Sequence, residues 1–147
     1  MKPRSELDDI KIHVKIKIAI LWVAATLCYI YGDIIGLYTS GAIQSMLDGK
    51  MGFWGPAIPQ SQGILLFIAV VISIPCIMVF LSLVLSSAIS RWLNIIVGSI
   101  FTLIALVMLP AGAIDLYFFA FYSIVEAILT GLIVWYAVKW PGQQVYA

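Results

Sequence analysis

Charged residues are scarce in this 147-residue chain. Asp, Glu, Lys and Arg together make up 10% of it, and 63% of the residues are hydrophobic. In a soluble domain roughly a quarter of the residues are charged. With a mean hydropathy of +1.10, the composition excludes an ordinary soluble globule and predicts an integral membrane protein of single-domain length.

Metal ligands and thiols are scarce as well. The chain has one histidine and two cysteines, Cys28 and Cys76, which both fall inside apolar runs. It has no CxxC pair and no HExxH sequence, so we expect no zinc, haem or thiol redox centre, no metal site and no cofactor. Because the net charge is only +1, we also expect no nucleic-acid partner.

Four apolar runs are long enough to cross a hydrocarbon layer of roughly 30 Å, which takes about 20 helical residues. The predicted spans cover residues 17–38, 61–86, 92–110 and 115–138. The fold class is therefore all-α, an integral membrane four-helix bundle that forms one membrane domain over residues 1–147. In the loop at 39–60, residues 42–47 favour a short amphipathic helix ending at Asp48-Gly49.

Local patterns refine these boundaries. From Ile10 to Ile18, lysines and a histidine alternate with aliphatic residues. Alternation is typical of a strand, but a single strand would have no partner, so a helical entrance with lysines reaching the headgroups is favoured. We expect a kink at Pro75, a break after Pro110 and an N-cap at Asp115.

The basic residues predict the orientation in the membrane. With the N-terminus inside, Lys50 is the only basic residue on the outer side, and all the others are inside. The positive-inside rule then favours an N-in/C-in protein of the cell membrane, with both termini cytoplasmic. The inner residues are Lys2, Arg4, Lys11, Lys15, Lys17, Arg91 and Lys139.

Each span also carries polar or small residues at helical spacing, which place them on one face. Glu126 lies eleven residues after Asp115, or ~16 Å into the hydrocarbon layer. A carboxylate that faces lipid at this depth costs about 3 kcal/mol or more, so Glu126 should face the interior and have partners. We expect a polar cleft open to the outside, with Glu126 near its floor. The candidate ligand-binding residues are Glu126, Asp33, Tyr29, Tyr122, Thr102, Ser73, Asn94 and Arg91.

The same residues allow a purely structural interpretation. Glu126 would be protonated and form a hydrogen bond across helices, Asp33 would lie among wet headgroups, and Arg91 and Asn94 would anchor an inner turn.

Several short sequences resemble those of a known family. They are Tyr29-Ile-Tyr-Gly-Asp33 with Gly36-Leu37, Arg91-Trp92-x-Asn94-Ile-Ile-x-Gly98, and Glu126 followed by Trp135-Tyr136-Ala137 and Trp140. Together they resemble a family of small prokaryotic four-span membrane proteins without an assigned activity. The resemblance implies a stand-alone four-helix membrane protein and gives no reaction to transfer.

Three functions stay open at this point. The first is a ligand-binding or proton-coupled transport protein for a small lipophilic or cationic ligand, which needs a homo-oligomer if it transports. The second is an intramembrane enzyme in which Asp33 and Glu126 act as acid and base on a lipophilic substrate. The third is an accessory subunit whose polar residues only hold helices together.

Overall fold

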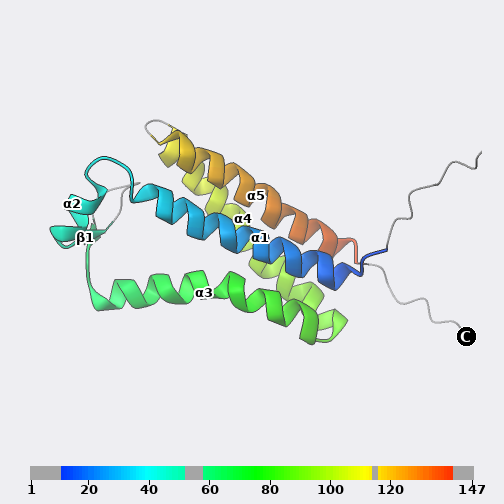
Figure 1. Ribbon diagram of the computed structural model, residues 1–147. Helices are drawn as coiled ribbons and strands as arrows, with labels where there is room; N and C mark the ends of the chain where they lie inside the picture. Colours follow the sequence, from blue (N-terminus) through cyan, green and yellow to red (C-terminus); the bar gives the residue numbers. More distant parts are fainter. Residues whose placement is uncertain (1–10, 52–57, 114–115, 141–147) are drawn as a thin grey trace, which may run out of the picture.

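The computed structural model describes residues 11–51, 58–113 and 116–140. The fold is all-α apart from one two-residue antiparallel ladder that pairs Lys50 with Pro59 and Met51 with Ile58. Four long helices run up and down in a bundle, and the short elements lie at one end of it (Figure 1). The elements are α1 (Val14–Gly36), α2 (Ala42–Leu47), β1 (Lys50–Met51), β2 (Ile58–Pro59), α3 (Gln62–Val84), α4 (Ser87–Ala113) and α5 (Tyr117–Val138).

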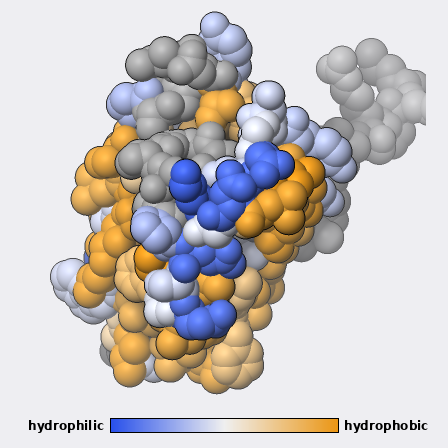
Figure 2. Space-filling model, turned by 90° about the vertical axis from the view of Figure 1, so that its left-hand side faces the viewer, coloured by the Kyte–Doolittle hydropathy of each residue, from blue (hydrophilic) through white to orange (hydrophobic). Residues whose placement is uncertain are grey.

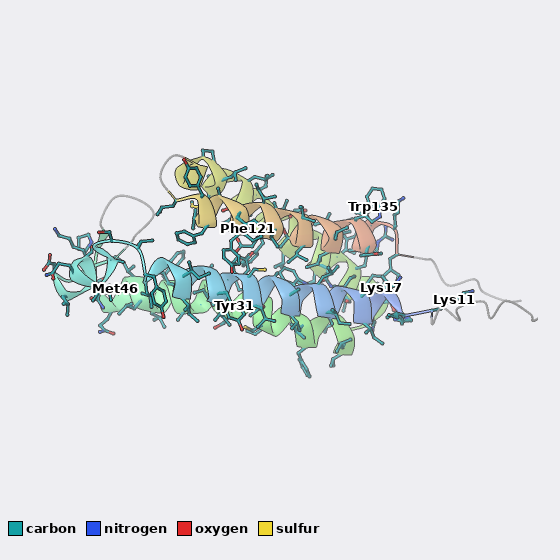
Figure 3. The ribbon with its side chains drawn as sticks, turned by 45° about the horizontal axis from the view of Figure 1, so that its top comes forward. Lys11, Lys17, Tyr31, Met46, Phe121 and Trp135 are labelled. Carbon is teal, nitrogen blue, oxygen red and sulfur yellow. The ribbon has the colours of Figure 1, made fainter. Side chains whose placement is uncertain are left out.

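The bundle has two distinct ends. We call the end that carries α2 and the two strands the loop end, and the end that carries residues 11–13 and Trp140 the terminal end (Figure 1). Met46 lies at the loop end, and Lys17 and Trp135 lie at the terminal end (Figure 3). Both ends of the described chain therefore lie on the same side of the bundle.

The outer surface of the long helices is apolar. All four are long and apolar enough to cross a membrane, which confirms the expectation of four apolar helices. Large side chains such as Leu66, Phe67, Ile100 and Leu103 are exposed on them. Figure 2, which looks onto the loop end, shows polar residues on that end face and hydrophobic residues over the flanks. Such a surface fits a multi-pass membrane protein, because lipid can cover apolar side chains that water could not.

Helices α4 and α5 pack most closely, and α1 packs against both α5 and α3. A Cβ atom added to Gly98 of α4 would lie 2.9 Å from Cγ2 of Val134 and 3.4 Å from Cγ2 of Ile133, both on α5. Only glycine therefore fits at Gly98. A small residue at a membrane helix interface lets the two backbones approach, which increases the van der Waals contact that holds them together.

A buried polar cluster ties α1, α3 and α4 together near the terminal end. The indole Nε1 of Trp22 donates to Oδ1 of Asn94 over 2.7 Å, and the hydroxyl of Ser82 donates to the same oxygen over 3.1 Å. The Asn94 amide nitrogen donates to the Ser90 carbonyl over 2.8 Å, and the Ser90 hydroxyl donates to the Ser82 carbonyl over 3.1 Å. All four residues are buried. If one of these hydrogen bonds were broken, water could not replace the missing partner, and the bundle would lose stability.

The first turn of α1 corrects one expectation. The helix begins at Val14, and His13 is its N-cap, with Nδ1 accepting from the backbone N–H of Lys15 over 3.3 Å. Residues 11–13 are therefore not helical. The His13 imidazole accepts the N–H of Lys15, which in a longer helix would have bonded to a preceding carbonyl.

Helix α4 is longer than expected at both ends. It begins at Ser87 because the extended backbone of Leu85 (ψ 156°) ends α3, so Arg91 lies inside α4 rather than in a turn. It also continues through Pro110 to Ala113. A proline removes only one backbone donor, a loss that membrane helices tolerate. The expected N-cap Asp115 lies outside the described residues.

Only one half of helix α3 has buried residues. Its buried residues are Pro75, Met78 and Ser82, all in the half towards the terminal end. The helix bends near its middle, where Pro75 lies (Figure 1). Proline causes such bends because its ring displaces the carbonyl four residues earlier. Cys76, which falls inside this apolar run, is exposed on the helix.

Candidate functional site

A cavity of about 270 Å³ lies between the four long helices, in the half of the bundle nearer the loop end. Every long helix supplies part of its wall, and the wall is mostly apolar with a few polar side chains. Cavities of this kind are the usual sites for small ligands. The lining residues are Tyr29, Gly32, Asp33, Phe67, Ile68, Val71, Ile72, Phe101, Ile104, Ala105, Met108, Phe119, Tyr122, Ser123 and Glu126.

Four of the eight candidate residues meet at this cavity: Glu126, Asp33, Tyr29 and Tyr122. Tyr29 and Asp33 are one turn apart on α1, and Tyr122 and Glu126 are one turn apart on α5, so each pair presents both side chains to the same face. Glu126 is half-buried, whereas Asp33, in the last turns of α1, is exposed and still contributes to the wall. Two carboxyl groups therefore border one cavity within a single chain.

Aromatic rings hold this wall in place. The ring centroid of Tyr29 lies 6.0 Å from that of Phe101, and Phe101 lies 6.0 Å edge-on from the buried Trp22. Such ring pairs stabilise one another beyond the area that they bury. On the other side, a Cβ atom at Gly32 would lie 3.7 Å from the ring of Tyr122, so α1 and the tyrosine are already in close contact. The tyrosines are thus positioned by packing.

Thr102 and Ser73 lie elsewhere. The Thr102 hydroxyl is 2.8 Å from the Thr130 hydroxyl and 2.8 Å from the Gly98 carbonyl, so it joins α4 to α5. The Thr130 hydroxyl in turn donates to the backbone carbonyl of Glu126 over 2.7 Å. Ser73 is exposed and donates to the Ala69 carbonyl over 2.7 Å, the local hydrogen bond that serines commonly form inside helices.

Asn94 and Arg91 also lie away from the cavity. Asn94 is the centre of the buried polar cluster, with its side-chain oxygen and nitrogen both bonded. Arg91 lies at the terminal end, where its guanidinium donates to the Val138 carbonyl over 3.2 Å. Both residues therefore join α4 to neighbouring helices near the terminal end.

The structure adds wall residues that sequence analysis did not single out. Ser123 is buried and lines the cavity three residues before Glu126, a spacing that could have indicated it. Val71 also lines it, and the proline at position 75 leaves the Val71 carbonyl without its helical amide donor. The wall that α3 supplies thus lies one turn before its proline.

No metal centre is assembled here: in residues 11–51, 58–113 and 116–140, His, Cys, Asp and Glu side chains nowhere gather in threes. The two carboxyl groups, the tyrosines and the apolar wall offer charge, hydrogen bonds and aromatic faces instead.

The fold and this cavity describe a small membrane protein with four membrane-length helices and no attached soluble domain among the described residues. Residues 7–147 match the model of a family of unknown function, DUF6326, and the chain belongs to that family. The resemblance to a family of small four-span membrane proteins without an assigned activity is thereby confirmed. No curated protein and no solved structure matches the chain.

Proposed function

We propose that this protein binds a small lipophilic cation in the cavity and that binding is coupled to proton release from Glu126. The observation that carries this proposal is the presence of Glu126 and Asp33 in the wall of one apolar cavity. A carboxylate in such surroundings is strongly destabilised unless it is protonated or paired with a cation. A bound cation and a proton therefore compete for the same group.

The rest of the wall suits the same ligand. Tyr29 and Phe101 present aromatic faces, which attract organic cations, and more strongly when water is excluded. The volume of about 270 Å³ limits the ligand to a small molecule. The carboxyl groups and the aromatic faces thus favour a small organic cation.

We further propose that the protein lies in the cell membrane with both termini cytoplasmic. Lys11, Lys15, Lys17, Arg91 and Lys139 belong to the terminal end of the bundle, and this asymmetry supports the orientation. The cavity then lies towards the outer leaflet. Four helices enclose too little interior for a complete alternating pathway, so transport would require a homo-oligomer, whereas binding requires only one chain.

Benzyltrimethylammonium, a small aromatic cation, is a direct probe. We expect it to bind the full-length protein in nanodiscs with an affinity that rises with pH, because deprotonation of Glu126 creates its partner. The Glu126→Gln variant should lose both the binding and its pH dependence. The Asp48→Asn variant, which removes a carboxylate from the loop end outside the cavity, should retain both. Equal binding by Glu126→Gln and the wild type would refute the proposal.

An acid–base enzyme is the second candidate, because both carboxyl groups and two tyrosines border the same cavity. One carboxyl group would protonate a lipophilic alkene and the other would remove a proton, as in an isomerisation or cyclisation. An isoprenoid alkene incubated in D₂O should then gain deuterium with the wild type. Neither Glu126→Gln nor Asp33→Asn should support the exchange, and no exchange with the wild type would reject this candidate.

The third candidate, an accessory subunit, would need no cavity between its helices. The presence of the cavity therefore favours the other two functions.

A further inference from the structure

A second, larger hollow of about 890 Å³ lies at the terminal end, far along the helices from the carboxylate cavity. Its walls come from residues 11–13, the first turns of α1 and α4, and the end of α5 with the residues that follow it. Four lysines and arginines line it, and none of the described lining residues is acidic. The lining residues are Lys11, Ile12, His13, Val14, Lys17, Ser87, Ala88, Arg91, Tyr136, Lys139 and Trp140.

Arg91 is partly buried in the wall of this hollow. One guanidinium nitrogen donates to the Val138 carbonyl, but its Nε atom is buried without a hydrogen-bond partner in the described part of the chain. A buried donor of a charged group that lacks an acceptor is strongly unfavourable. The planar guanidinium presents several N–H donors on one edge, which matches the oxygen atoms of a phosphate. The structure therefore contains an unsatisfied anion-binding donor.

Two lysines near the hollow are held by aromatic rings instead of carboxylates. The ammonium of Lys17 lies 5.5 Å from the ring centroid of Tyr136, and that of Lys139 lies 3.8 Å from the ring centroid of Trp135. Lys17 and Trp135 lie at the same end of the bundle (Figure 3). A ring face attracts a cation without accepting its N–H hydrogen bonds in full. These ammonium groups therefore keep donors for an anion.

Lys15 provides an internal contrast. Its ammonium donates to the carbonyls of Leu85 and Leu83, over 2.6 Å and 3.3 Å, and it does not line the hollow. Its hydrogen-bonding capacity is used within the fold, whereas Lys17, Arg91 and Lys139 line a hollow with no acidic residue among those that the structure describes. The two groups of cations thus have different roles.

We propose that this hollow binds the phosphate group of an anionic phospholipid. A phosphate supplies an acceptor for Nε of Arg91 and a counter-charge that the described lining residues do not give to Arg91, Lys17 and Lys139. The helix ends beside the hollow also expose apolar side chains, namely Ile16, Ile89 and Val138, along which acyl chains can lie. A soluble phosphate would use the cations and leave these side chains without a role. Basic pockets between membrane helices are a recurrent form of headgroup recognition.

Lipid binding can be counted directly by native mass spectrometry of the full-length protein in detergent. Dioleoylphosphatidylglycerol and dioleoylphosphatidylcholine share their acyl chains and differ in net charge. We expect phosphatidylglycerol to be retained and phosphatidylcholine to be lost. Equal retention of the two lipids would overturn the proposal. Glycerol phosphate tests the soluble source, and binding as tight as that of phosphatidylglycerol would overturn the lipid assignment.

Variants locate the site. Lys17→Gln and Lys139→Gln should each weaken phosphatidylglycerol binding about fivefold, the effect of one basic residue at a charged membrane surface. Arg91→Gln should weaken it more, because it removes the buried donor. Lys50→Gln removes a basic residue at the loop end and should leave binding unchanged. If Arg91→Gln does not fold, the two lysine variants still test whether the lipid binds in this hollow. Undiminished binding by both would refute the proposed location.

Discussion

The contact between α4 and α5 at Gly98 yields a sharp prediction for Gly98→Ala. The added Cβ would lie 2.9 Å from the Val134 side chain and 3.6 Å from the Thr130 backbone carbonyl. Valine has one strongly preferred rotamer in a helix, so the backbones must separate rather than the side chain rotate. Overpacking of this kind costs about 1–3 kcal/mol.

Helix propensity acts in the opposite direction, because alanine is favoured over glycine inside a helix by about 1 kcal/mol. Gly131→Ala provides the control, because an added Cβ there meets no described heavy atom within 4 Å. Propensity affects both variants equally, so their difference isolates the steric contact. We expect Gly98→Ala to be less stable than Gly131→Ala by about 1–3 kcal/mol.

The measurement is equilibrium unfolding in mixed micelles with increasing dodecyl sulfate, followed by circular dichroism. Each variant is compared with the wild type at the same lipid and detergent composition. If Gly98→Ala proves as stable as Gly131→Ala, the close approach of α4 and α5 at Gly98 is refuted.

Three further predictions use the same unfolding assay. Trp22→Phe and Asn94→Leu should each destabilise the bundle, and in a double-mutant cycle they should show a coupling of about 0.5–2 kcal/mol; additive effects would contradict their hydrogen bond. Lys15→Met should cost about 1 kcal/mol because it leaves the carbonyls at the end of α3 without a donor, and a loss no larger than that of Lys50→Met would contradict this role. Gly32→Ala should leave stability unchanged or raise it by up to about 1 kcal/mol, since its Cβ makes an ordinary contact, and a marked loss would show that α1 and Tyr122 are closer than described.

The helices could be predicted from the sequence because apolar length alone defines them. Their ends could not, because these depend on local hydrogen bonds. His13 caps α1 with its imidazole, and Pro110 stays inside α4, although both residues suggested other boundaries.

The candidate site was predicted in part for a related reason. Helical spacing correctly grouped Tyr29 with Asp33 and Tyr122 with Glu126, because residues on one helix share a face wherever that helix packs. Spacing does not tell how α3 and α4 are rotated about their own axes. The sequence therefore did not reveal that Ser73 is exposed on the surface of α3 or that Asn94 lies in the buried polar cluster.

The two halves of α3 differ in how firmly they are packed against the bundle. Its half towards the terminal end is fixed by Ser82 and Met78, while the residues before Pro75, although they line the cavity through Val71, include none that is buried. The wall that α3 gives to the cavity is therefore less firmly packed than the half of α3 beyond Pro75. For the proposed ligand, this predicts sideways entry from the bilayer by displacement of the half of α3 before Pro75, while the half beyond it stays in place.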